Sequence, residues 1–281
     1  MINQEQIRGA WDGIAEGYDE FVTPLMLPLW EQILRRVDIS SGMRLLDVAA
    51  GTGALSLPAA RRRAQVVATD IAPGMIERLI RRARNEGLSN IEGKVMDGLS
   101  LELGDNTFDV AASAFGVTIF PDLKRGLGEM VRVTKPLGKV LIVALGSPQK
   151  AEFFGFFLGA LKATVPGFTG PPTDPPPVQF QVADPEKFRQ ALSDSGLTDI
   201  MVDTVTIGME FQSGAHLWGL LMSSNPMGPQ LVINLTDEQR ATVKEVLDRM
   251  LRERSGGKGS AILNLEVNIG IGTKPKTERR S

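Results

Sequence analysis

The segment Leu45-Leu46-Asp47-Val48-Ala49-Ala50-Gly51-Thr52-Gly53 constrains the fold more than any other part of the chain. An apolar run ends there in a carboxylate and passes into a tight turn of small residues, and a helix is expected from Ala54. Asp70 closes the next apolar run, Gln65–Thr69, and Asp97 follows the next short strand candidate. Ligands of open parallel sheets bind beyond the carboxyl ends of the strands. Three acids beside one glycine turn therefore predict a pocket for a nucleoside, and hence a ligand that contains adenosine.

Composition excludes several kinds of site and partner. The chain has 281 residues and a formal net charge of −2, so no overall field draws it to nucleic acid or to an anionic membrane. It has no cysteine and one histidine, which removes thiolate chemistry and multi-histidine zinc sites, and we expect no metal. The first residues lack the features of a secretory signal, and no uninterrupted apolar span reaches membrane length. We therefore expect a cytoplasmic protein without stable membrane insertion.

Strands and helices alternate along the first half of the chain. Residues 4–37 are predicted to form two helices, the second opened by Pro24. The turn Lys135–Gly138 is expected to precede the fifth strand. The predicted strands are Arg44–Val48, Gln65–Thr69, Ile91–Met96, Phe108–Ala114 and Lys139–Ala144, and the predicted helices between them are Leu55–Arg63, Pro73–Glu86 and Leu123–Val133. Such alternation indicates an α/β fold in which helices cover both faces of a parallel sheet.

The C-terminal third has a different character. Phe153–Val165 is apolar on nearly all sides, and a proline-rich loop follows from Gly167 to Pro177. Asp184 is expected to cap a helix that Gly196 ends. The tail from Lys274 is expected to be frayed. The remaining predicted elements are a strand Ile200–Ile207, helices Ser213–Ser223 and Asp237–Arg254, the latter entered by Thr236, and a last strand Ala261–Ile271.

The side chains around the glycine turn favour one nucleoside ligand over another. Asp70 is placed to accept both hydroxyls of a ribose, and Asp97 to accept the exocyclic amine of adenine. A dinucleotide-binding turn would carry a third glycine where this chain has Ser56, and Asp47 would repel a pyrophosphate. S-adenosylmethionine instead carries a sulfonium and an ammonium group and no phosphate. The residues therefore favour S-adenosylmethionine as the cofactor.

These motifs resemble those of the class I S-adenosylmethionine-dependent methyltransferases, most closely the small-molecule branch of ubiquinone and menaquinone biosynthesis. The resemblance covers about Trp11 to Ala144. The family's first motif, acid-x-Gly-x-Gly-x-Gly, corresponds to Asp47–Gly53, with Ala49 in place of the first glycine. The resemblance implies a Rossmann-like, mostly parallel sheet of seven strands whose last strand runs antiparallel. It also implies an N-terminal helical lid and a helical insertion in the C-terminal third.

The resemblance further implies which residues hold the cofactor. Tyr18 lies in a segment similar to the family's lid, in which a tyrosine reaches the carboxylate of the cofactor. Ile71 and Met75 would flank the adenine, and the end of the fourth motif, Ala114 and Phe115, would lie beside the sulfonium and its methyl group. The complete implied set is Tyr18, Asp47, Ala49, Gly51, Gly53, Asp70, Ile71, Met75, Asp97, Gly98, Ala114 and Phe115.

Methyl transfer from a sulfonium requires an aligned acceptor and the exclusion of water. A base is needed only if the acceptor must lose a proton. His216 is the candidate base, with Asp19 and Glu210 as weaker ones, and the alternative for His216 is a packing role beside Leu217 and Trp218.

The acceptor is expected to lie under the C-terminal third. Phe153–Phe157, the proline-rich loop and Leu217–Met222 fall where this family places elements that cover the substrate. Their aromatic and methionine side chains favour a small apolar or aromatic acceptor. The alternative for Phe153–Val165 is a buried helix of the core.

We divide the chain into an N-terminal helical lid (1–40), a cofactor-binding core (41–146), the remainder of the sheet with substrate-covering insertions (147–273) and a tail (274–281). Two other functions stay open. An NAD(P)-dependent oxidoreductase would be stabilised by NADH, and a non-catalytic S-adenosylmethionine-binding module would bind the cofactor without turnover. The acceptor atom, the need for a base and the oligomeric state, with a homodimer as one option, also stay open.

Overall fold

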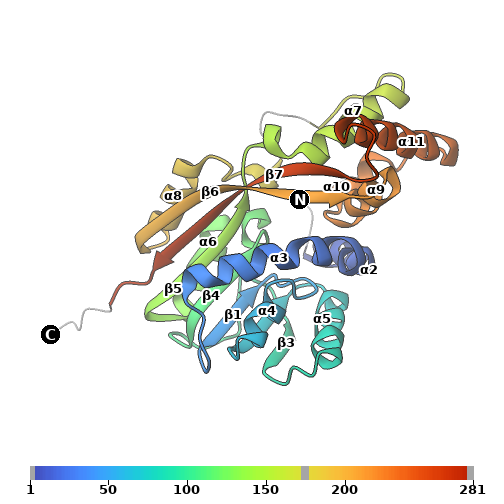
Figure 1. Ribbon diagram of the computed structural model, residues 1–281. Coiled ribbons are helices and arrows are strands. Elements are labelled where there is room, and N and C mark those ends of the chain that lie inside the picture. The colour runs from blue at the N-terminus through green and yellow to red at the C-terminus, as the bar shows by residue number, and fades with distance from the viewer. Residues whose placement is uncertain (1–3, 172–176, 277–281) are drawn as a thin grey trace.

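A seven-stranded sheet forms the centre of the protein, with strand order β3-β2-β1-β4-β5-β7-β6 (Figure 1). The computed structural model describes residues 4–171 and 177–276. The strands are β1 (Arg44–Val48), β2 (Gln65–Asp70), β3 (Ile91–Val95), β4 (Phe108–Ala114), β5 (Thr134–Leu145), β6 (Thr198–Phe211) and β7 (Ala261–Thr273). Strands β1 to β5 are parallel, and β7 runs antiparallel to both β5 and β6. This arrangement confirms the predicted fold class, including the reversed last strand.

Helices pack on both faces of the sheet, because the parallel strands are apolar on both sides. Leu45 and Leu46 are both fully buried and belong to two separate apolar clusters. The first cluster lies under α3, α4, α7, α9 and α11, and the second under α6 and α8. The helices are α1 (Gln4–Asp12), α2 (Ala15–Gly17), α3 (Thr23–Ile33), α4 (Ser56–Arg61), α5 (Pro73–Asn85), α6 (Leu123–Val133), α7 (Glu152–Thr164), α8 (Pro185–Asp194), α9 (Gly214–Ser223), α10 (Met227–Leu231) and α11 (Asp237–Arg254).

Two predicted helix starts are confirmed by their capping hydrogen bonds. The carboxylate of Asp184 accepts from the backbone N–H groups of Glu186 and Lys187, both at 2.9 Å. Thr236 caps α11, and Gln239 completes a capping box there. Side-chain acceptors at these positions satisfy N–H groups that have no partner within the helix.

The N-terminal segment is more broken than the two predicted helices. Between α1 and the end of this segment lie α2, a π-helical turn η1 (Tyr18–Val22), α3 and a 3₁₀ turn η2 (Leu34–Val37). Single π turns inside helices are frequent at functional sites. We call residues 4–37 the lid segment.

The other strand predictions differ from the structure mainly at their ends. Strand β5 starts at Thr134 rather than Lys139, because the predicted turn is absorbed as an irregularity in the pairing with β4. Leu137 has a φ of 66° there. Strand β6 extends past Ile207 to Phe211, because β7 pairs with it as far as Ala261. The short helix α10 was not predicted. The proline-rich loop and the tail lie partly outside the described residues, at 172–176 and 277–281.

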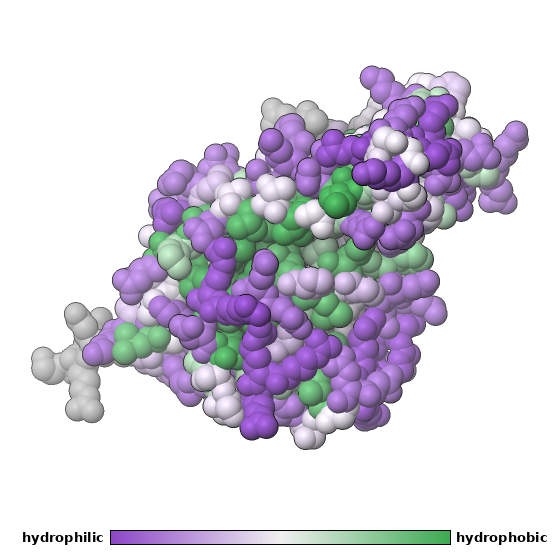
Figure 2. All heavy atoms as spheres, in the orientation of Figure 1, coloured by the Kyte–Doolittle hydropathy of each residue, from purple (hydrophilic) through white to green (hydrophobic). Residues whose placement is uncertain are grey.

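Strands β6 and β7 form a long antiparallel pair that reaches from the sheet to the helical group α7, α9, α10 and α11 (Figure 1). Helix α11 packs on α7 and α9, and α9 also packs on α2 and η1 of the lid segment. Apolar residues gather at the surface across the middle of the face shown, between α3 and the strands β6 and β7 (Figure 2). Within the described ranges, no helix is long and apolar enough to span a membrane.

Candidate cofactor-binding site

The turn after β1 has a backbone that favours glycine. Gly51 and Gly53 have φ values of 54° and 95°, and Ala49 has a φ of 55°. A Cβ atom on Gly53 would lie 2.9 Å from Cγ of Leu79 on α5, so this position has no space for a side chain. The alanine that replaces the first motif glycine therefore has a left-handed conformation that costs it about 1 kcal/mol. The tight turn predicted from the sequence is present, with strain at Ala49.

Asp70 ends β2 beside this turn and is only 8% exposed. Its Oδ2 accepts from the N–H of Gly51 at 2.9 Å, and its Oδ1 accepts from the N–H of Ala72 at 2.9 Å. Burial raises the pKa of Asp70, and hydrogen bonds from Ala72, Gly51 and Ile71 lower it. Each carboxylate oxygen can accept more than one hydrogen bond. The turn therefore orients a carboxylate that can still accept two ribose hydroxyls.

Asp47 lies at the base of the turn and is fully buried. Its Oδ2 accepts from the hydroxyl of Ser56 at 2.6 Å, while its Oδ1 has no hydrogen-bond partner. Burial raises the pKa of Asp47 to about 7, and the charge of Asp70 adds to the increase. In the sequence Ser56 argued only against a dinucleotide-binding turn. The structure shows that its hydroxyl also holds this carboxyl group. An unpartnered buried acceptor suits a cationic or donor group of a ligand.

Tyr18 of the lid segment lies over the glycine turn. A Cβ atom on Gly51 would be 3.4 Å from Cε1 of Tyr18. Burial raises the pKa of Tyr18, and the nearby charges of Asp70 and Asp47 raise it further. Its ring also packs edge-on against Trp11, with centroids 6.5 Å apart. The lid tyrosine and both acids are therefore brought together.

Polar contacts hold the lid segment on the elements of the core. Asp12 accepts from the N–H of Gly74 on α5 at 2.6 Å, and the hydroxyls of Thr23 and Thr52 share a hydrogen bond. Asp19 forms ion pairs with Arg81 and Arg82 of α5, the former at 3.3 Å. These contacts were missed because they join residues far apart in the chain.

Asp97 follows β3 at the same edge of the sheet. Its Oδ1 accepts from the N–H of Leu99 at 2.9 Å, and its Oδ2 accepts from Nε2 of Gln4 at 2.7 Å. One oxygen of the carboxylate that is predicted to accept from adenine is thus already hydrogen-bonded to the side-chain amide of Gln4 in the lid segment. Gly98 is needed because a Cβ atom there would lie 2.5 Å from the ring of Phe120.

Met75, one of the two predicted adenine neighbours, lies under the lid segment. Met75 is 1% exposed and clusters with Ala15 and Ala72, and Trp11, Ile14 and Tyr18 pack against these three residues. Ile71 is half-buried.

The end of β4 approaches the turn from the other side. Phe115 has a φ of 63° and packs edge-to-face on Trp30 of α3, with centroids 5.6 Å apart. A Cβ atom on Gly116 would lie 2.3 Å from Cβ of Ala49. Ser113 donates to the carbonyl of Val48 at 2.8 Å, which ties β4 to β1. Ala114 and Phe115 therefore adjoin the turn, as does Ser113 of the same motif, and Trp30 is a neighbour that the sequence did not indicate.

The candidate bases are engaged in other contacts. Nδ1 of His216 accepts from the N–H of Gln212 at 3.3 Å, and its ring packs against Phe211 and Phe21 at centroid distances of 5.4 and 6.2 Å. Glu210 accepts from the hydroxyl of Ser260 at 2.5 Å, and Asp19 is held by arginines as described above. The geometry around His216 favours the packing alternative.

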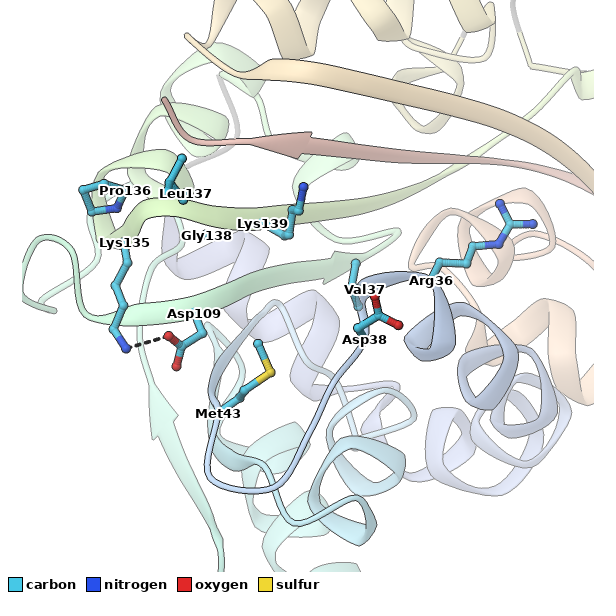
Figure 3. A pocket seen from close by; sticks show the side chains of 10 residues that line it. All are labelled: Arg36, Val37, Asp38, Met43, Asp109, Lys135, Pro136, Leu137, Gly138 and Lys139. Carbon is cyan, nitrogen blue, oxygen red and sulfur yellow. Dashed lines mark hydrogen bonds and ion pairs between the residues drawn. The ribbon is translucent and has the colours of Figure 1, made fainter. Parts of the chain in front are cut away.

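A cavity of about 340 Å³ lies where the parallel strands begin, at the end of the sheet opposite to the motifs (Figure 3). It is lined by residues that precede or begin strands, including Met43 and Asp109. Lys135 pairs with Asp109 at 2.6 Å, and Lys139 donates to Thr273 at 2.7 Å. This cavity is therefore separate from the candidate site, which lies at the carboxyl ends of the strands.

Comparison with solved structures supports the fold. Phosphoethanolamine N-methyltransferase 2 of Haemonchus contortus, in complex with S-adenosyl-L-methionine, superposes with a TM-score of 0.56 at 19% identity. The alignment with the S-adenosyl-L-methionine complex covers 89% of this chain and 53% of that one. At this identity the likeness concerns the fold alone.

Comparison of sequences identifies the family. The model of the ubiE/COQ5 methyltransferase family matches residues 1–162, and the chain belongs to this family. Demethylmenaquinone methyltransferase of Renibacterium salmoninarum is 28% identical over 218 residues, which cover 73% of this chain and 89% of that protein. An uncharacterised protein of Mycobacterium tuberculosis (strain H37Rv) is 35% identical over 138 residues, 49% of each chain. The chain thus spans about half the length of the first curated relatives that it matches. The resemblance suggested by the motifs is confirmed.

Proposed function

We propose that this protein transfers a methyl group from S-adenosylmethionine to a small lipophilic or aromatic acceptor. One observation carries the proposal: the buried Oδ1 of Asp47 lacks a partner at the turn where Asp70 offers its carboxylate. A diphosphate at this place would meet two acids, whereas an ammonium group would supply the missing donor. Membership in the ubiE/COQ5 methyltransferase family supports the same cofactor.

The residues present fit S-adenosylmethionine. We assign Asp70 to the ribose hydroxyls, Asp97 to the adenine amine, and Asp47 with Tyr18 to the amino-acid end of the cofactor. The adenine amine would compete with Gln4 for Oδ2 of Asp97, because the side-chain amide of Gln4 already donates to that atom. The full proposed set is Tyr18, Asp47, Ala49, Gly51, Gly53, Asp70, Ile71, Met75, Asp97, Gly98, Ala114 and Phe115.

The protein's own contribution to catalysis is alignment and exclusion of water. The bound cofactor supplies an activated methyl group on a sulfonium, which is a good leaving group. Two aromatic residues lie beside the end of β4: Phe115, which is half-buried, and Trp30, which is buried. The reaction would therefore take place away from bulk water. His216 can act as a base only if its Nδ1 gives up the hydrogen bond from Gln212, either to take a proton itself or to receive the proton that frees Nε2.

The acceptor is proposed to bind between the lid segment and the helical group α7, α9, α10 and α11. Helix α9 packs closely on η1, where a Cβ atom on Gly219 would lie 2.6 Å from the ring of Phe21, so this contact closes one side of the proposed acceptor site. Phe157 and Trp218 add an edge-to-face pair at 6.0 Å between α7 and α9. The demethylmenaquinone methyltransferase relative makes a naphthohydroquinone the first acceptor to test.

The division of the chain follows from the same proposal. Residues 1–40 form the lid, 41–146 bind the cofactor, 147–273 complete the sheet and cover the acceptor, and 274–281 form a tail. We also propose that the protein acts in the cytoplasm, that its acceptor is not a nucleic acid, and that a homodimer is compatible with the exposed surface of the sheet's edge strands.

A thermal-shift assay with S-adenosylhomocysteine and NADH tests the cofactor, and transfer of a radiolabelled methyl group to demethylmenaquinol tests the reaction. We expect stabilisation by S-adenosylhomocysteine alone, and incorporation of label into the acceptor. Stabilisation by NADH alone would support the oxidoreductase alternative. Cofactor binding without transfer to any acceptor in a panel of hydroquinones and phenols would support the non-catalytic alternative.

A further inference from the structure

The indole N–H of Trp30 is a buried hydrogen-bond donor without an acceptor. The residue is 1% exposed on α3, and its Nε1 has no hydrogen-bond partner. Buried tryptophans usually find an acceptor for this N–H. Among the buried unpartnered side-chain atoms of the described residues, it is the one that can only donate. A phenylalanine at this position would fill much of the same space without leaving a donor unpaired.

Trp30 lies beside the proposed reaction site. Its ring packs edge-to-face on Phe115, which directly follows β4 and has a strained, left-handed φ. The next residue, Gly116, is in close contact with Ala49 of the glycine turn. Tryptophan side chains in helices lean toward the helix N-terminus. For α3 that end is Thr23, whose hydroxyl contacts the turn at Thr52. Through its contact with Phe115, the ring that carries the unpaired donor therefore lies at the end of the sheet that carries the motifs.

Two buried groups without a partner thus occur at this end of the sheet, one on Asp47 at the base of the turn and one on Trp30 beside Phe115. They have opposite character. Oδ1 of Asp47 can accept a hydrogen bond, and Nε1 of Trp30 can donate one. The first is assigned above to the cofactor. The second remains for the other substrate, and it lies among aromatic side chains.

We propose that the indole N–H of Trp30 donates a hydrogen bond to an oxygen of the methyl acceptor, and so orients an oxygen-bearing aromatic ring toward the cofactor. The inference rests on the proposed function and makes Trp30 a specificity-determining residue for it. A phenol or hydroquinone supplies both the ring that packs against Phe115 and the oxygen that satisfies the donor. An acceptor without that oxygen would leave the N–H unpaired and would be discriminated against.

The first experiment observes the donor directly. The chain has three tryptophans, Trp11, Trp30 and Trp218, so protein labelled with ¹⁵N-tryptophan gives three indole N–H signals. Spectra of Trp11→Phe and Trp218→Phe assign them. With S-adenosylhomocysteine bound, 1,4-naphthohydroquinone should move the Trp30 signal downfield, and naphthalene should not. An unmoved Trp30 signal at saturating hydroquinone, equal shifts with both probes, or no binding of the hydroquinone overturns the inference.

The second experiment removes the donor. In Trp30→Phe we expect the KM for 1,4-naphthohydroquinone to rise about tenfold, which is the loss of one hydrogen bond. The affinity for S-adenosylhomocysteine should stay within about twofold. Ile33→Val is the matched control, because Ile33 is equally buried on α3 and loses packing but no donor. An unchanged KM in Trp30→Phe, or an equal rise in Ile33→Val, overturns the inference.

The experiments distinguish an error in the proposed function from an error in the role of Trp30. If the wild-type protein does not bind S-adenosylhomocysteine, the proposed function is wrong. If it binds the cofactor and methylates a hydroquinone while the Trp30 signal and the KM of Trp30→Phe stay unchanged, only the role of Trp30 is wrong. The spectroscopic experiment uses the wild-type donor, so it decides the matter even if Trp30→Phe fails to fold.

Discussion

The buried carboxyl of Asp47 should make the stability of the protein fall as the pH rises. Its pKa of about 7 in the folded chain lies above the value of 3.8 expected in the unfolded chain. The folded state therefore binds more protons than the unfolded state between pH 4 and 7, and the free energy of unfolding decreases across this range. This difference in pKa corresponds to at most about 4 kcal/mol of the free energy of unfolding. Its main cause is burial of the ionised carboxyl group.

The substitution Asp47→Asn removes this ionisation and keeps a similar shape. Urea unfolding at pH 4.5, 5.5, 6.5 and 7.5 should show the wild-type protein losing about 2–4 kcal/mol across the series. The variant should lose much less, with the remainder due to Asp70, whose pKa is also raised. Asp109→Asn is the control, because Asp109 is paired with Lys135 and its pKa is lowered. It should keep the wild-type slope. Parallel curves for wild type and Asp47→Asn would refute the reasoning.

Three further outcomes are expected at the candidate site. Asp70→Ala should weaken the binding of S-adenosylhomocysteine by about 1–3 kcal/mol in calorimetry, because ribose hydroxyls lose their acceptor; an unchanged affinity would contradict the assignment. Gln4→Ala should strengthen that binding by about two- to fivefold, because the adenine amine no longer competes with Gln4 for Oδ2 of Asp97; weaker binding would show that Gln4 serves the ligand. His216→Phe should keep turnover within a few-fold of wild type, because Nδ1 is already an acceptor for Gln212; a loss of about a hundredfold with normal cofactor affinity would establish a base.

The local signals in the sequence were sufficient for most of the sheet. Strands β1 and β4 and helices α6 and α11 have the predicted bounds, because apolar runs and caps act within a few residues. The end of β6 could not be predicted, since Gly208 and Glu210 are poor strand residues and only their pairing with Asn264 and Ile262 of β7 keeps them in the sheet.

The candidate site shows the same division between local and distant causes. The acids and glycines were found because each stands next to its own strand. Trp30 and Gln4 were missed, because a residue's place beside Phe115 or Asp97 depends on how the lid segment packs on the core. Ser56 was noticed in the sequence, but its hydrogen bond to Asp47 could be found only from the folded turn.

The lid segment is fixed on two sides at once. On one side Asp12 and Asp19 attach it to α5, and on the other a Cβ atom on Gly17 would lie 2.1 Å from Oγ of Ser223 on α9. If the two substrates bind where we propose, a displacement of this segment that admits one of them also moves residues around the other. The binding of the nucleoside and the binding of the acceptor should accordingly be coupled.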